Sequence, residues 1–204
     1  MLEMWNERYS KNEYAYGVKP NEFLKDTLEK LELTGEMLFP AEGEGRNAVY
    51  AAKTGLNVSA FDISAEGRKK ALNLAAKENV SVNYEVGSFF DLELVNHKFD
   101  AVALIYAHFP PPILSKYHHK IAELIKPKGF VILEGFSKGN LELKAKNPKV
   151  GGPGKIEMLF SVDSIRKDFP DFEIIQIEEV EIELNEGLYH NGRGKVIRFI
   201  GQKK

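Results

Sequence analysis

The sequence has 204 residues, of which 43% are hydrophobic and 28% charged, so it predicts one folded domain over residues 1–204 and excludes a disordered chain. The formal net charge of −2 leaves no large basic field, so we expect no nucleic-acid partner. Absence of cysteine excludes disulfide frameworks, thiolate zinc sites and cysteine nucleophiles. With no signal-peptide pattern and no apolar run of roughly 20 residues, the sequence predicts a cytoplasmic protein that does not bind membranes.

Short β-branched and aromatic runs alternate with helical patterns along most of the chain, after an N-terminal helical segment over residues 1–34. This alternation predicts a Rossmann-like, mostly parallel sheet with helices on both faces. Ser64 is a suitable cap for one of these helices, and Pro127-Lys128-Gly129 is expected to end another. The predicted strands are 36–40, 57–61, 82–86, 99–105 and 129–136, and the predicted helices are 47–54, 65–77 and 111–125.

The C-terminal part departs from this alternation. A short helix over 162–169 is followed by two strands, 172–184 and 195–202, with no helix between them. Their connection, a predicted loop of about ten residues over 185–194, indicates an antiparallel hairpin that completes a seven-stranded sheet. The segment 137–155, with its glycines, prolines and five lysines, is expected to be a loop.

A glycine-rich segment, Ala41-Glu42-Gly43-Glu44-Gly45-Arg46-Asn47, lies between the first predicted strand and the next helix. Glycines there allow a tight turn and the close approach of a ligand to main-chain amides. The next strand ends at Asp62, whose carboxylate can accept hydrogen bonds from both hydroxyls of an unphosphorylated ribose. Together they predict a nucleoside cofactor. The alternative is a turn without a ligand, with Asp62 as a helix cap.

The glycine spacing argues against a dinucleotide. Arg46 stands where the third glycine of the dinucleotide pattern belongs, and Gly45 comes one residue too early. We expect Arg46 to prevent the close helix–strand packing that the glycine would allow. A ligand that carries an amino acid suits this loop better than a pyrophosphate, and a nicotinamide-dependent oxidoreductase is a disfavoured alternative.

The segment Glu-Gly-Glu-Gly-Arg-Asn, followed by Phe-Asp-Ile-Ser, resembles the S-adenosylmethionine (SAM) binding region of class I SAM-dependent methyltransferases. The fourth strand, the entry to the fifth and the terminal hairpin also resemble that fold. Trp5-Asn6-Glu7-Arg8-Tyr9 and Gly151-Gly152-Pro153 look like the small bacterial tellurite-resistance and thiopurine-methyltransferase-like group. The resemblance implies methyl transfer from SAM to a small-molecule acceptor by in-line displacement, with S-adenosylhomocysteine (SAH) as product, in a monomer or homodimer.

Residue by residue, the resemblance implies a set of cofactor-binding positions at the ends of the first four strands. These are Ala41, Glu42, Gly43, Gly45, Asn47, Asp62, Ile63, Ser88, Phe89 and Ile105. Glu42 is expected to supply negative charge near the cofactor's ammonium, and the amide and ring of Phe89 are expected to hold the adenine. The family pattern has an acid in place of Phe39, a glycine in place of Ala41 and an acid in place of Ser88. These departures leave a non-catalytic SAM-binding protein as an alternative.

Methyl transfer from a sulfonium depends chiefly on holding the two reactants in line and excluding water, and it needs a base only if the acceptor must lose a proton. Tyr106 and His108, directly after the fourth strand, and His190, in the terminal hairpin, are the predicted acceptor-side residues. His108 has two interpretations. It acts on the acceptor as a base or hydrogen-bond donor, or it packs on the proline turn that follows it. His190 is either functional or an ordinary loop residue. His118 and His119 are expected on the surface, with no metal.

The aromatic N-terminus and the lysine-rich segment each allow two interpretations. Trp5, Tyr9, Tyr14 and Tyr16 form either a lid over the cofactor, where aromatic rings suit a sulfonium, or a terminal segment packed on the sheet. The lysines of 137–155 form either an anion-attracting flap or a solvated loop.

Overall fold

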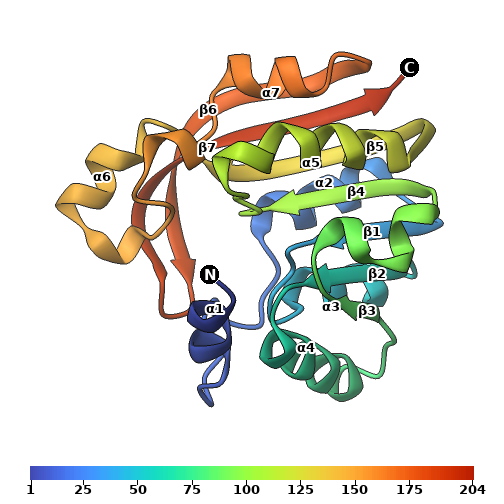
Figure 1. The fold of residues 1–204 in the computed structure, drawn as a ribbon, viewed down its shortest axis with the longest axis horizontal. Coiled ribbons are helices and arrows are strands. Elements are labelled where there is room, and N and C mark those ends of the chain that lie inside the picture. The colour runs from blue at the N-terminus through green and yellow to red at the C-terminus, as the bar shows by residue number, and fades with distance from the viewer.

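The computed structural model describes residues 1–204 and contains one seven-stranded sheet in the order β3-β2-β1-β4-β5-β7-β6 (Figure 1). The first five strands run parallel, and β7 is antiparallel to both β5 and β6. The predicted Rossmann-like fold with a terminal antiparallel hairpin is therefore confirmed. The strands are β1 (Glu36–Pro40), β2 (Asn57–Asp62), β3 (Asn83–Val86), β4 (Phe99–Ile105), β5 (Ile125–Phe136), β6 (Phe172–Glu186) and β7 (His190–Lys203).

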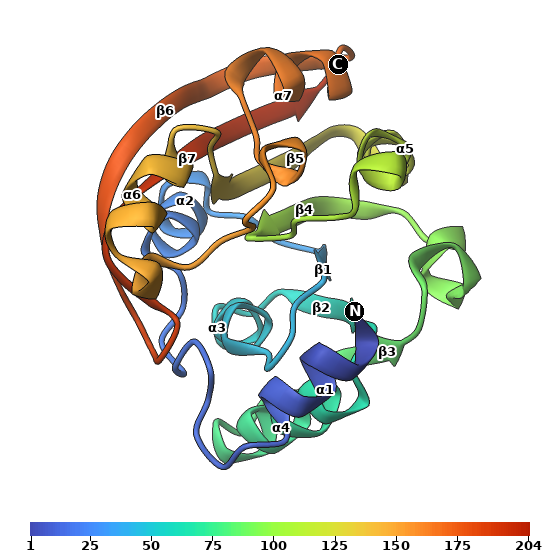
Figure 2. The ribbon, with the colours of Figure 1, turned by 60° about the vertical axis from the view of Figure 1, so that its left-hand side comes forward.

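Helices cover both faces of this sheet (Figure 2). No helix is long and apolar enough to cross a membrane. The α-helices are α1 (Leu2–Tyr9), α2 (Glu22–Leu31), α3 (Arg46–Lys53), α4 (Ala65–Lys77), α5 (Pro111–Leu124), α6 (Asn140–Lys146) and α7 (Val162–Asp168). Short 3-10 turns are η1 (Phe89–Asp91), η2 (Glu93–Asn96), η3 (Pro148–Val150) and η4 (Ile156–Met158).

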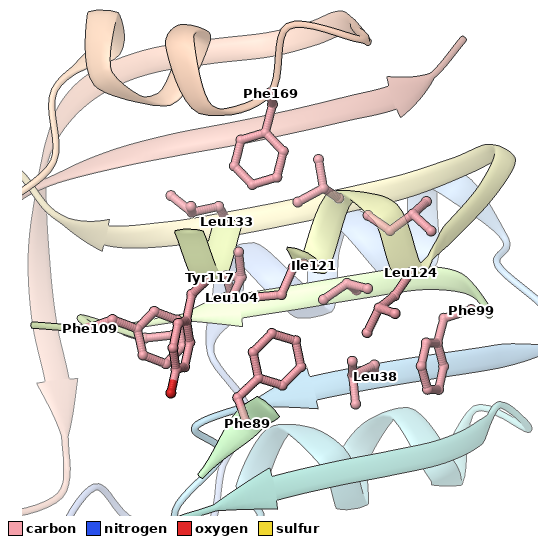
Figure 3. Packing of buried hydrophobic residues seen from close by; sticks show 14 of the residues in the cluster. Leu38, Phe89, Phe99, Leu104, Phe109, Tyr117, Ile121, Leu124, Leu133 and Phe169 are labelled. Atoms are coloured by element: carbon pink, nitrogen blue, oxygen red, sulfur yellow. The ribbon is translucent and has the colours of Figure 1, made fainter. Parts of the chain in front are cut away.

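Two hydrophobic cores form because successive strand residues point to opposite faces. In β1, Leu38 joins the core under α5 and α7, whereas Met37 and Phe39 join the core under α2, α3 and α4. Figure 3 shows the first core, in which Phe89 lies near Leu38 and Tyr117 lies beside Phe109. The sheet is therefore buried on both faces, which explains why its strands are apolar throughout and do not alternate between apolar and polar residues.

Several predicted bounds are confirmed. Strands β1 and β4 and helix α4 have the predicted limits. Ser64 caps α4 as expected, because its side chain accepts a hydrogen bond from the Gly67 amide at 3.1 Å.

Strand β5 begins earlier than predicted. It starts at Ile125, directly after α5, and its pairing with β4 shifts register between Phe99 and Ala101. Lys128, at φ 66°, lies in this irregularity, so the expected Pro-Lys-Gly turn is a distortion within the strand.

The predicted ten-residue loop over 185–194 is wrong. Strands β6 and β7 continue until Glu186 pairs with His190, so only three residues form the turn. Two glycines within the predicted loop are close-packing positions in β7. A Cβ at Gly192 would lie 2.6 Å from Asn147 Nδ2, and one at Gly194 would lie 2.6 Å from Leu184 Cδ1.

The segment 137–155 is also more ordered than predicted. It contains α6 and η3, and Val150 is fully buried. Val150 packs with Phe136 and Leu184 in a third small core, which fixes this segment against the start of β7. We call residues 147–155 the flap.

Candidate functional site

The carboxyl ends of β1 and β4 form the place where the strand order reverses, and open α/β sheets bind ligands at such a point. Two non-glycine residues there have left-handed main chains: Ala41 after β1, at φ 52°, and Tyr106 after β4, at φ 53°. Such conformations cost about 1–3 kcal/mol each and gather at functional sites. Ala41 thus has a left-handed conformation that a glycine would adopt at lower cost, whereas Phe39 is buried in the core.

Asp62 joins the loop after β1 to the turn after β2. One carboxylate oxygen accepts from the Gly43 amide at 3.0 Å, and the other accepts from the Ser64 amide at 2.9 Å. Burial raises the pKa of Asp62 to about 6, although these amides oppose the shift. The helix cap itself is Ser64, so the carboxylate of Asp62 retains lone pairs for further donors.

The two loop glycines are required by their neighbours. A Cβ at Gly45 would lie 2.5 Å from the Ala71 Cβ in α4, and a Cβ at Gly43 would lie 2.6 Å from the Tyr9 hydroxyl. Gly45 therefore allows a close contact between the start of α3 and α4, which differs from the helix–strand contact of the dinucleotide pattern. The Arg46 side chain turns away and pairs with Glu186 at 3.0 Å.

Glu42 and Asn47 bind the ends of other elements. One Glu42 oxygen accepts from the Asn47 and Ala48 amides, at 2.9 and 2.8 Å, and so caps α3. Burial raises the pKa of Glu42 to about 7. The side-chain oxygen Oδ1 of Asn47 accepts from the main-chain amide of Asn21 at 2.9 Å, which ties the segment before α2 to the glycine loop.

On the expected adenine side, the ring of Phe89 is not accessible. It is 1% exposed and stacks on Phe61 with ring centroids 5.0 Å apart. The prediction that this ring holds the adenine is therefore wrong, which leaves only the Phe89 main chain for that contact. Ser88 is exposed, Ile63 is half-buried, and Ile105 is buried at the end of β4.

The N-terminal helix α1 lies alongside α4 and beside the glycine loop (Figure 2). Tyr9 is buried against Gly43, and Trp5 stacks on Tyr9 with centroids 5.3 Å apart. The Ser64 hydroxyl donates to Asn6 Oδ1 at 2.6 Å. The position suits a lid and also suits simple packing, although the packing is on α4 and not on the sheet.

An aromatic cluster lies on the other side of the edge, made of Tyr16, Tyr106, Phe136, Tyr189 and His190. The His190 ring is the centre of this cluster, with centroids 4.5 Å from Tyr16, 4.6 Å from Tyr106 and 5.1 Å from Phe136. Two of the three predicted acceptor-side residues, Tyr106 and His190, are thus in contact.

Two carboxylates that the sequence did not predict, those of Glu186 and Glu134, bind the polar atoms of this cluster. His190 Nδ1 lies 2.9 Å from Glu186, and Tyr106 donates its hydroxyl to Glu134 at 3.0 Å. Glu134 is fully buried and also accepts from Asn21 and Arg198, at 2.6 and 2.7 Å. Only the position of Glu134 near the end of a buried strand could have indicated its role.

His108 is not free to act on an acceptor in this structure. Its Nδ1 donates to the Met158 carbonyl at 2.8 Å, and its Nε2 accepts from the Phe136 amide at 3.0 Å. Burial lowers the pKa of His108 to about 4, which keeps the ring neutral. The geometry favours the packing interpretation, because both nitrogens already join β5 to η4.

His118 is buried, so its predicted surface position is wrong. It is 0% exposed, its Nδ1 lies 2.7 Å from Asp168, and it packs between α5 and α7. His119 is exposed as predicted. No group of three or more His, Asp or Glu side chains is arranged to hold a metal ion.

Comparisons with known proteins give a similar domain for one segment of the chain. Residues 40–129, which include the glycine loop and Asp62, match a family described as a methyltransferase domain. No curated protein matches the sequence significantly.

Solved structures share the fold at low sequence identity. A protein studied for the conversion of a disulfide bond into a thioacetal group during echinomycin biosynthesis is 20% identical, with a TM-score of 0.77 over 100% of this chain and 93% of that one. TehB from Haemophilus influenzae is 14% identical, with a TM-score of 0.69 over 100% and 67%. Magnesium protoporphyrin IX methyltransferase from Synechocystis, with bound SAH, is 17% identical, with a TM-score of 0.67 over 90% and 81%.

The structural likenesses show the fold that this chain shares with SAM-dependent methyltransferases. The sequence match adds that residues 40–129, less than half of the chain, are similar to a methyltransferase domain.

Proposed function

We propose that the chain methylates a small molecule and holds SAM at the carboxyl ends of β1, β2 and β4. The observation that supports this site best is Asp62, a buried acid at the end of β2 that already organises the Gly43 amide. Such an acid fits the hydroxyls of an unphosphorylated ribose, and the strained loop at Ala41 brings main-chain amides to the same edge. SAM supplies an activated methyl group that needs no further activation by the protein.

In this proposal the chain's own residues bind and orient. Asp62 accepts hydrogen bonds from the ribose, the main chain of Ala41–Gly43 receives the amino-acid part, and the main chain at Ser88 and Phe89 borders the adenine. Ile105, at the end of β4, separates this site from the aromatic cluster. The α1 helix, which buries Tyr9 against Gly43, excludes water from the loop.

For the acceptor, we place a small molecule at the aromatic cluster. The flap packs against this cluster, since a Cβ at Gly151 would lie 2.7 Å from His190 Cδ2. We further propose the small bacterial tellurite-resistance and thiopurine-methyltransferase-like group. The two segments that carry this resemblance, around Trp5–Tyr9 and Gly151–Pro153, both lie at this edge. The monomeric or homodimeric state, the cytoplasmic location and the lack of a nucleic-acid partner stay predictions.

Calorimetry with SAM and with SAH tests the cofactor site. We expect both to bind, and we expect Asp62→Ala to weaken binding roughly 10- to 100-fold, because a hydrogen bond to a charged group contributes about 1.5–3 kcal/mol. Asp171→Ala, at an exposed aspartate, is the matched control. No heat and no thermal shift with either ligand at millimolar concentration would refute the site, and an unchanged affinity in Asp62→Ala would refute the ribose assignment.

Turnover is tested separately. Release of SAH from SAM is measured with a panel of thiols, selenite, tellurite and small heterocycles. A protein that binds SAM but releases no SAH with any of them would favour the alternative of a non-catalytic SAM-binding protein.

A further inference from the structure

We propose that His190, oriented by Glu186, takes a proton from the acceptor, so that the site selects acceptors that are still protonated at neutral pH, thiols foremost. The proposal rests on the proposed function, because it assumes that the acceptor lies at the aromatic cluster. It adds a catalytic residue and two positioning residues, Glu186 and Arg46.

The hydrogen bonds of His190 leave one ring nitrogen available. Its Nδ1 donates to Glu186 at 2.9 Å, whereas its Nε2 makes no hydrogen bond within the protein. The Nε2 of His118, in contrast, is sealed from solvent, and both nitrogens of His108 are occupied. Among the buried or half-buried histidines, His190 alone presents an accessible nitrogen with a free lone pair.

Glu186 fixes the orientation of this lone pair. It accepts from His190 on one side and pairs with Arg46 at 3.0 Å, and Asn21 donates to it at 3.3 Å. A carboxylate on Nδ1–H determines the tautomer, makes Nε2 the basic nitrogen and stabilises the imidazolium that forms when Nε2 accepts a proton. The arrangement resembles the base–orienter pairs that activate nucleophiles in other enzymes.

The surroundings keep His190 neutral until the acceptor arrives. Burial lowers the pKa of His190, Arg46 and Arg8 lower it further, and Glu186 opposes them. The other charged or titratable groups near the ring are Tyr16, Tyr106, Tyr189 and the neutral His108. Three aromatic rings surround the imidazole and exclude water. The acceptor therefore has little competition from water for the lone pair of His190 Nε2.

The proton balance of the step is simple. The acceptor S–H gives its proton to His190 Nε2 while the sulfur electron pair forms the bond to the methyl carbon. The bond between that carbon and the sulfonium breaks, and its electron pair stays on the cofactor sulfur, which becomes neutral. The imidazolium beside Glu186 then releases the proton to solvent. Thiols suit this base better than alcohols or phenols do, because their pKa of about 8.5 lies closer to that of an imidazole than the pKa of about 10 of a phenol.

The first test uses two probe thiols: 2-mercaptoethanol, which is a thiol at neutral pH, and 4-nitrothiophenol, which is already a thiolate. The variant is His190→Asn, whose amide can still donate to Glu186 but has no basic nitrogen. We expect kcat/KM for 2-mercaptoethanol to fall about 100-fold or more, as for loss of a general base, and kcat/KM for 4-nitrothiophenol to fall less than about threefold. His119→Asn, at an exposed histidine, is the matched control.

The second test needs no variant. With the wild-type protein, kcat/KM for 2-mercaptoethanol should stay nearly flat from about pH 7 to 8, because burial lowers the pKa of His190 below its usual value of about 6.5. Attack by thiolate drawn from solution would instead raise it about tenfold per pH unit. A tenfold slope, or an equal loss for both thiols in His190→Asn, would overturn the proposal. If the wild type binds SAM but methylates neither thiol, the thiol assignment fails while the cofactor site stands.

Discussion

Glu42 shows how one residue can stabilise a helix and destabilise the protein at the same time. Its carboxylate caps α3, yet burial raises its pKa from 4.5 to about 7. Between these two pH values the folded state binds more protons than the unfolded state, so the free energy of unfolding decreases as the pH rises through this window. Above about pH 7 the protein carries a buried charge whose full desolvation cost opposes folding.

We therefore predict that Glu42→Gln gains stability relative to the wild type as the pH rises from 5 to 8. The glutamine oxygen can still accept from the Asn47 and Ala48 amides, so the cap is retained. Urea denaturation at both pH values measures the difference, and all other titrating groups are shared by the two proteins. An identical difference at pH 5 and pH 8 would show that Glu42 does not titrate in this window.

Gly45 and Gly55 allow two costs of a glycine substitution to be separated. Both have left-handed main chains, at φ 87° and 96°, but a Cβ at Gly45 would lie 2.5 Å from Ala71, whereas a Cβ at Gly55 would meet nothing within 4 Å. We predict that Gly55→Ala costs about 1–2 kcal/mol from main-chain strain alone. Gly45→Ala should cost about 1–3 kcal/mol more, because α3 and α4 must separate. Equal midpoints in urea denaturation would contradict the packing role of Gly45.

At the scale of elements, the open question about α1 is whether it moves as a lid or stays packed. It has eight residues, and only Tyr9 among them is buried. Its packing on the rest of the protein therefore depends on a few contacts at Gly43 and Ser64. A short helix of this kind is marginal by itself. Cofactor entry beside Gly43 would therefore require that α1 opens and closes.

We predict that SAH slows amide hydrogen exchange in residues 1–20 and in the glycine loop, and leaves exchange in α7 unchanged. The physical reason is that a ligand under α1 adds contacts only to its closed position. Mass spectrometry of deuterated peptides, with and without SAH, measures this. If α1 exchanges equally fast in both samples while the glycine loop is protected, α1 is a packed terminus and not a lid.

Two features of the secondary structure elements were predicted wrongly from the sequence: the turn between β6 and β7, and the position of His118 on α5. Residues 185–194 were predicted to form a loop, but Gly192 and Gly194 are strand residues that make room for Asn147 and Leu184. His118 was expected on the surface because its sequence neighbours are lysines. Its hydrogen-bond partner Asp168 lies in α7, 50 residues later in the chain, and no local sequence pattern predicts that contact.

At the scale of the whole molecule, the alternation of strands and helices was sufficient to predict the fold, because a sheet buried on both faces demands uninterrupted apolar strands. The glycine loop and Asp62 were predictable for the same reason: they directly follow such strands. The network around His190 was not. Arg46, Glu186 and Glu134 lie on three separate elements. Arg46 pairs with Glu186, and Asn21 donates to both glutamates, so the network exists only after the hairpin closes on the loop edge.

Strand β6 has a consequence for how the protein behaves in a crowded solution. It is the outermost strand, 15 residues long, and its free edge would be a template for pairing with another copy. Five exposed glutamates line this strand: Glu173, Glu178, Glu179, Glu181 and Glu183. A second β6 placed against the first would bring like charges together, so the sheet is protected from growing by edge-to-edge aggregation.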